Sequence, residues 1–145
     1  MTELAKQIKH NWTDAWLLLA IIYANTNGVA TLDRVIAAGD LINQAIFKPE
    51  EFESGLYRLT AGGYITQHDR AFKITEKVTG TSRKISLGSG YVNEDLKQIE
   101  LLLTTSRRQR ALPNNLKYAG FSISVFRAAL KKHIASFGER SEKPR

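Results

Sequence analysis

Cysteine is absent from this chain of 145 residues. Without thiols the protein has no disulfide, no thiolate nucleophile and no cysteine-based zinc site, and nothing favours an oxidising compartment. Long apolar runs are missing as well, because the longest extends from Ala15 to Ala24 and a membrane-spanning helix needs about 20 residues. No cationic leader with a small-residue cleavage site precedes that run. We therefore expect a cytoplasmic protein with neither a signal peptide nor a membrane-spanning segment.

Motifs for catalysis and metal binding are also scarce. His10, His68 and His133 are scattered along the chain, and we expect none of them to have an acidic partner at the i±3 or i±4 spacing of a helical metal site. No serine lies in a nucleophile elbow. His68 beside Asp69 suggests acid-base chemistry, but an exposed turn does not exclude water. The sequence predicts no catalytic residue, no metal and no cofactor.

Positive charge is concentrated near the end of the chain. The net charge of +7 divides into −1 for residues 1–47 (three basic, four acidic), 0 for residues 48–80 (five of each) and +8 for residues 81–145 (thirteen basic, five acidic). All of the last excess falls in residues 107–145, where ten basic residues meet two acidic ones. A block of this kind is typical of phosphate contacts or of a solvated basic segment.

A helix followed at once by a β-hairpin is predicted within residues 48–75. Pro49 suits the first position of a helix and Gly62 the left-handed residue past its end, so we predict a helix over residues 49–61. After it, β-branched and aromatic residues flank a polar turn at residues 68–70, which favours a short hairpin. The apolar stripe of the helix has i, i+4, i+7 spacing and consists of Phe52, Leu56 and Leu59.

The hairpin is expected to have one buried face. Its strands are predicted at residues 64–67 and 71–75, and Val29 and Ala30 are predicted to add a short third strand. The side chains expected to point inward are Ile65, Phe72 and Ile74.

Two helices are predicted ahead of this unit. The first, over residues 13–25, has Thr13 as its N-cap and is apolar nearly all round. The second runs from an N-cap at Thr31 to about Asn43, and Gly39 within it costs about 1 kcal/mol relative to alanine. A helix without a polar face must be covered on several sides. We expect the C-terminal helices or a second subunit to cover the first helix, and predict a homodimer.

The second half of the chain is predicted to contain a frayed helix after Thr75 and two longer helices. One begins at Asn93 and ends near Ser106, and the other begins at Ser122 or Ser124 and ends near Phe137. The last helix has basic residues beside its apolar stripe, so it could dock on the core, bind a partner or lie on an anionic surface. The two stripes are Leu96, Ile99, Leu102 and Leu103, and Phe126, Leu130, Ile134 and Phe137.

These elements define the expected fold class: mainly α with a small β-hairpin wing (α+β), comprising a winged helix-turn-helix core plus C-terminal helices. The expected division is a winged helix-turn-helix domain over residues 1–86, a C-terminal helical extension over 87–137 and a basic, disordered tail over 138–145.

In the order helix, helix, helix, wing, residues 13–75 resemble the winged-helix domains of MarR-like and PadR-like bacterial transcription regulators. The resemblance covers just under half of the chain and lies in the pattern of elements. It implies that the third helix enters the major groove of duplex DNA and that the wing touches phosphate or minor groove. The residues implied for DNA contact are Ser54, Tyr57 and Arg58 on the helix and His68, Arg70 and Lys73 on the wing.

Three arginines follow the predicted end of the helix at Ser106. They either complement the negative end of the helix dipole as solvated side chains or bind phosphates. The three are Arg107, Arg108 and Arg110.

The predicted reading helix departs from a DNA-binding pattern in its charge. Glu50, Glu51 and Glu53 lie on its outward side, where carboxylates repel phosphates, although a glutamate can accept from a cytosine amino group. Carboxylates in a first turn also complement the helix dipole. The alternative function is therefore a protein-protein interaction module, in which this acidic helix recognises a basic partner or the chain's own C-terminal region and binds no DNA.

Overall fold

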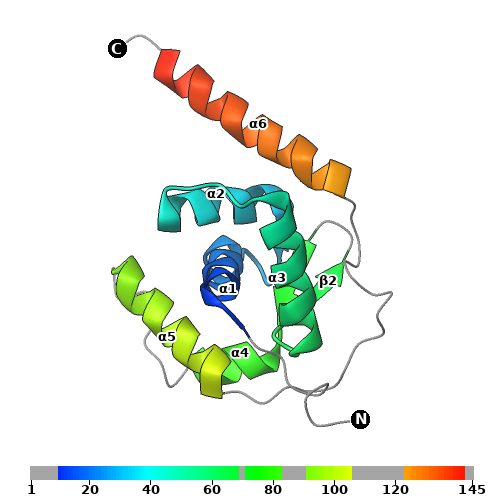
Figure 1. Ribbon diagram of the computed structural model, residues 1–145, viewed down its shortest axis with the longest axis vertical. Coiled ribbons are helices and arrows are strands. Elements are labelled where there is room, and N and C mark those ends of the chain that lie inside the picture. Colours follow the sequence, from blue (N-terminus) through cyan, green and yellow to red (C-terminus); the bar gives the residue numbers. More distant parts are fainter. Residues whose placement is uncertain (1–9, 69–70, 83–90, 106–122, 143–145) are drawn as a thin grey trace.

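The computed structural model describes residues 10–68, 71–82, 91–105 and 123–142 (Figure 1). It is mainly helical with a three-stranded antiparallel sheet, which confirms the predicted fold class. In the described part of the chain, no helix combines the length and apolarity needed to cross a membrane. The elements are α1 (Trp12–Ala24), β1 (Ala30–Thr31), α2 (Leu32–Asn43), α3 (Pro49–Ala61), β2 (Ile65–His68), β3 (Ala71–Ile74), α4 (Glu76–Ser82), α5 (Val92–Thr105) and α6 (Ile123–Glu142).

Helix α1 is the centre of the molecule, with α2, α3 and α5 arranged around it (Figure 1). Its residues from Asp14 to Ile21 are at most 3% exposed. The expectation that further elements cover this helix is met within the chain, because α5 packs against it. The N-cap is Asn11, whose side chain accepts from the Asp14 backbone N–H at 3.0 Å. The predicted cap at Thr13 was wrong, because Asn11 satisfies the amide in its place.

The sheet has the strand order β1-β3-β2, with Ile65 opposite Ile74 and Gln67 opposite Phe72. The predicted third strand is present, but it comprises Ala30 and Thr31. Val29 instead forms an isolated bridge with Thr26. Of the side chains expected to point inward, Ile65 and Phe72 are fully buried and Ile74 is half-buried.

Gly39, predicted to weaken α2, permits a close contact with Phe47. A Cβ atom at this position would lie 2.2 Å from Phe47 Cε2. The ring of Phe47 stacks on Trp16 with centroids 3.9 Å apart, and the indole N–H of Trp16 donates to the Gly39 carbonyl at 2.8 Å. Packing therefore offsets the low helix propensity of glycine here.

Helix α3 spans the predicted residues, Pro49–Ala61, and buries the predicted stripe. A capping hydrogen bond of 3.0 Å joins the Lys48 backbone N–H to the Glu51 carboxylate. The predicted left-handed residue Gly62 has φ −79°, whereas Gly63 has φ +83°. The left-handed position therefore lies one residue later than predicted.

The two long C-terminal helices differ from their predicted bounds. Helix α5 begins at Val92, and the N–H groups of Glu94 and Asp95 donate to the Tyr91 carbonyl, so the predicted cap Asn93 lies inside the helix. Helix α6 continues past the predicted end at Phe137 to Glu142 and so includes residues predicted to form a disordered tail. Its predicted cap Ser124 lies inside the helix, and the alternative, Ser122, is outside the described residues.

Candidate nucleic-acid interface

The outward side of α3 carries more acid than base. Glu50 is exposed, and Glu53, Ser54 and Tyr57 are half-buried. The opposite side of the helix is anchored in the core by Phe52, Leu56 and Leu59, all 0% exposed. Two of the predicted DNA-contacting residues, Ser54 and Tyr57, therefore share the surface of α3 with carboxylates.

Arg58, the predicted cation of α3, is bound to a buried carboxylate. Its Nε lies 2.7 Å from Asp14 Oδ2 and its Nη2 lies 2.7 Å from Oδ1, a bidentate contact. Asp14 is 0% exposed and the Arg58 side chain 26% exposed. The hydrogen bond that Arg58 donates to Asp14 is the main cause that raises the pKa of Arg58. The geometry therefore uses Arg58 to fasten α3 to α1.

A glycine makes this contact possible. A Cβ at Gly55 would lie 2.9 Å from Leu17 Cδ2 and 3.4 Å from Asp14 Oδ1. Residue 55 therefore needs the smallest side chain for α3 to approach α1 closely enough for the ion pair.

His10 completes the cluster, with Nδ1 2.9 Å from Asp14 Oδ2. The prediction was that no histidine has an acidic residue at i±3 or i±4 that makes a metal pair; Asp14, four residues after His10, is its hydrogen-bond partner. That spacing was visible in the sequence. The burial of Asp14 and its partnership with Arg58, which is 44 residues away, were not. Among the described residues, no group of three potential ligands could hold a metal ion.

The hairpin presents a small polar face to solvent. Thr66 and Lys73 are opposite each other in the register, and His68 lies two residues after Thr66 on the same face of β2. All three are exposed, and the His68 ring forms a 2.9 Å hydrogen bond with the Thr66 hydroxyl. Two predicted wing residues, His68 and Lys73, therefore point away from the core. Arg70 lies outside the described residues.

Lys77, which follows the hairpin, has an internal role. Its ammonium donates to the Gly62 carbonyl at 2.7 Å and lies 4.4 Å from the centroid of the Tyr64 ring. Partial burial lowers the pKa of Lys77. This cation joins α4 to the turn after α3.

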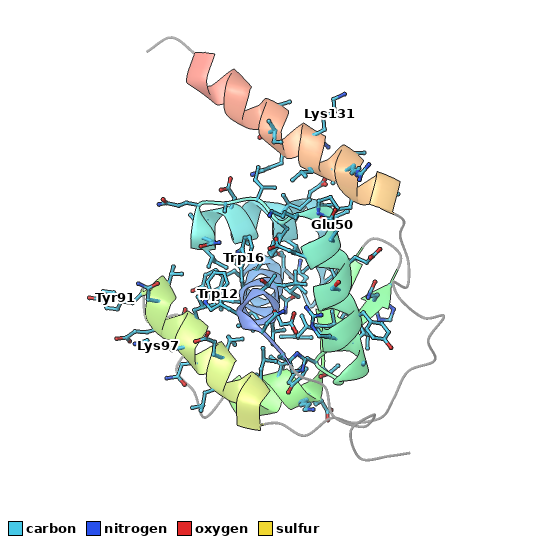
Figure 2. The ribbon with its side chains drawn as sticks, viewed as in Figure 1. Trp12, Trp16, Glu50, Tyr91, Lys97 and Lys131 are labelled. Carbon is cyan, nitrogen blue, oxygen red and sulfur yellow. The ribbon has the colours of Figure 1, made fainter. Side chains whose placement is uncertain are left out.

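Helix α6 brings exposed cations close to the start of α3. Phe126 packs on Phe52 with ring centroids 4.5 Å apart, and His133 Nε2 lies 3.0 Å from Asp40 Oδ2 on α2. Lys131 projects away from the core (Figure 2). The exposed basic residues of this helix are Arg127, Lys131 and Lys132.

Among the described residues, exposed cations lie on the hairpin and on α6, and carboxylates lie on the outward side of α3. Arg107, Arg108 and Arg110 lie outside the described residues. A polyanion could contact the two basic groups without a cation on α3. No protein-family model, curated protein or solved structure matches the chain.

Proposed function

We propose that this protein is a cytoplasmic, non-enzymatic winged-helix DNA-binding protein that regulates transcription. The observation that carries the proposal is the exposed basic side of α6, formed by Arg127, Lys131 and Lys132, on a helix packed against α2 and α3. Lys73 and His68 on the hairpin add a second contact. Cations of this kind bind phosphates without reading sequence.

Base contacts in this proposal come from α3 and are few. Ser54 and Tyr57 can donate hydrogen bonds, and Glu50 or Glu53 can accept from a cytosine amino group. Arg58 is omitted, because Asp14 occupies its guanidinium. We therefore expect modest sequence discrimination and strong dependence on backbone charge.

We also propose that the protein acts as a homodimer. Exposed apolar side chains support this, because Leu41 on α2 and Ile134 on α6 are 72% and 51% exposed. Each directly follows a member of the Asp40–His133 contact, so the two lie near the same α2–α6 junction. Sedimentation equilibrium tests this directly: a monomer at micromolar concentration contradicts it.

The test of DNA binding is fluorescence anisotropy with a duplex of about 20 base pairs at low salt. Neutralising Arg127, Lys131 and Lys132 together to glutamine should weaken binding at least about tenfold and reduce the salt slope by about 0.9 per lost phosphate contact. Lys97→Gln is the matched control, because Lys97 is an exposed cation on α5, well separated from Lys131 (Figure 2). Equal affinities for the triple variant and the control would contradict the proposal.

The second candidate is a protein-binding module, favoured by the acidic side of α3 and by the withdrawal of Arg58 into its contact with Asp14. The double change Glu50→Gln and Glu53→Gln separates the candidates. It should tighten duplex binding if α3 faces phosphates, because two repulsive charges are removed. In the second candidate the chain does not bind the duplex, and the substitutions instead weaken binding of a basic protein partner.

A further inference from the structure

A cavity of about 420 Å³ lies between the start of α1 and the outer side of α5. This volume falls in the range of small-molecule sites. One wall is apolar: Trp12 is 41% exposed, Leu101 is 56% exposed, and Leu103 lines the cavity beside them. Trp12 is supported from behind by Trp16, with ring centroids 5.8 Å apart. The cavity therefore offers an aromatic surface at its opening.

Two hydrogen-bond donors line this cavity. One is the ammonium of Lys97, which has no ion pair with any described residue. The other is the carboxamide NH₂ of Asn11: the oxygen of this group caps α1 by accepting from the Asp14 N–H, and the NH₂ has no partner among the described residues. Both donors suit a carboxylate.

An acceptor lines the same cavity. Glu100 lies on the next turn of α5 from Lys97 and, within the described chain, also forms no ion pair. Its carboxylate suits an ammonium group. His10 also lines the cavity; its side chain is 5% exposed and its Nδ1 lies against the Asp14 carboxylate.

We propose that this cavity binds an α-amino acid with an apolar side chain. The ammonium of the ligand lies against Glu100, its carboxylate against Lys97 and Asn11, and its side chain against Trp12 and the leucines. Glu100 would repel a simple carboxylic acid, and Lys97 would repel a simple amine. A zwitterion with an apolar body satisfies both ends, and this proposal does not depend on DNA binding.

The anchoring of His10 favours a pre-organised site. Asp14 holds its Nδ1 while Arg58 holds both carboxylate oxygens, so the ring has little rotational freedom to lose on binding. The same contacts join the cavity to α3.

The test is calorimetric titration of the full chain with L-phenylalanine. We expect saturable binding with Kd of about 1 mM or tighter. Phenylalaninamide, which lacks the carboxylate, and 3-phenylpropionate, which lacks the ammonium, should each bind at least about tenfold more weakly, because one charge of the cavity then loses its partner and repels the ligand. Absence of saturation up to about 10 mM, or equal binding of all three compounds, overturns the proposal.

Two variants test which residue binds the carboxylate of the ligand and which binds its ammonium. Lys97→Met should weaken phenylalanine binding and strengthen phenylalaninamide binding, because it removes a charge that repels the amine. Glu100→Gln should weaken phenylalanine binding and strengthen 3-phenylpropionate binding for the corresponding reason. Arg34→Gln and Glu76→Gln are matched controls, because both side chains are exposed and outside the cavity lining. Circular dichroism checks that each variant is folded. Wild-type affinity for phenylalanine in both cavity variants overturns the assignment.

Discussion

Helices α5 and α6 have similar amphipathic stripes, but the core covers them to very different extents. The four stripe residues of α5, Leu96, Ile99, Leu102 and Leu103, are all at most 8% exposed. On α6, Phe126 is 1% exposed while Ile134 is 51% exposed. Helix α5 packs against the central helix α1, whereas α6 lies outside α2 and slopes away from it toward the C-terminal end (Figure 1). The stripe of α5 is therefore covered along its length, and that of α6 is covered only where α6 lies close to the core.

The polar contacts of α5 are more deeply buried than those of α6, as its apolar residues are. On α5, the Tyr23 hydroxyl donates to Asp95 at 2.5 Å, and Asp95 is 1% exposed. On α6, His133 and Asp40 are each 14% exposed, and Lys132 lies 3.9 Å from Asp33 with both side chains largely in water. Helix α5 is thus part of the core, and the contacts of α6 with the core reach from Phe126 to His133. That attachment leaves its cations accessible.

The largest contrast should come from equivalent truncations on the two helices. Ile99→Ala should lower the free energy of unfolding by about 2–5 kcal/mol, because a fully buried side chain leaves a cavity. For the monomer, Ile134→Ala should change it by no more than about 0.5 kcal/mol, because that side chain is half in water outside the proposed dimer interface. Urea denaturation followed by circular dichroism measures both. A similar loss of unfolding free energy in the two variants would contradict the difference in burial between Ile99 and Ile134.

The next effect concerns the buried anchor of α5. Tyr23→Phe removes the hydroxyl that donates to Asp95 and should cost about 1–3 kcal/mol of unfolding free energy, because it weakens the solvation of a buried carboxylate. Tyr57→Phe on the half-exposed side of α3 is the control. The same urea assay should show a loss only for Tyr23→Phe.

Alkaline pH should remove the contribution of Tyr23 gradually. Burial, then the hydrogen bond and negative charge of Asp95, raise the pKa of Tyr23 in the folded state. A raised folded-state pKa means that the stabilisation is complete below the unfolded value of about 10 and is lost as pH rises above it, by up to about 1.4 kcal/mol per pH unit. The stability gap between wild type and Tyr23→Phe should therefore narrow above about pH 10. A constant gap would contradict this.

The smallest effects are expected on α6. His133→Ala should cost about 1 kcal/mol through loss of one partly buried hydrogen bond, and Lys132→Ala less than about 0.5 kcal/mol, because exposed ion pairs contribute little. Amide hydrogen exchange can locate the change. His133→Ala should accelerate exchange in α6 and leave α5 protected, whereas faster exchange in both helices would contradict a separate attachment of α6.

Much of the fold could be predicted because local signals agreed. Helix α3 matches its predicted bounds because Pro49 at the start and the glycine pair at the end act on the backbone directly. Two helix boundaries were predicted wrongly. Thr13 was predicted as the cap of α1, but Asn11, two residues earlier and also of a favoured N-cap type, takes that place. Gly138 did not end α6, since one glycine costs a helix only about 1 kcal/mol.

The site was harder to predict because its chemistry depends on distant partners. From its place on the predicted DNA-reading helix, Arg58 was expected to contact DNA. Its partner Asp14 lies two helices earlier in the chain, so the pair was not visible in the sequence. Gly39 was predicted only to weaken α2. Its close contact with Phe47 depends on tertiary packing, which the sequence does not show. By contrast, His10 and Asp14 have i, i+4 spacing, so that pair could have been found from sequence.

Duplex binding by the full chain, measured as a function of salt, tests the central claim most directly. If the exposed cations of α6 and the hairpin bind phosphates, log affinity should fall linearly with log salt concentration, with a slope of about −0.9 for each phosphate contacted. Contacts from Arg127, Lys131, Lys132 and Lys73 together predict a slope of about −3.6 or steeper. No binding at low salt, or an affinity independent of salt, would contradict the account.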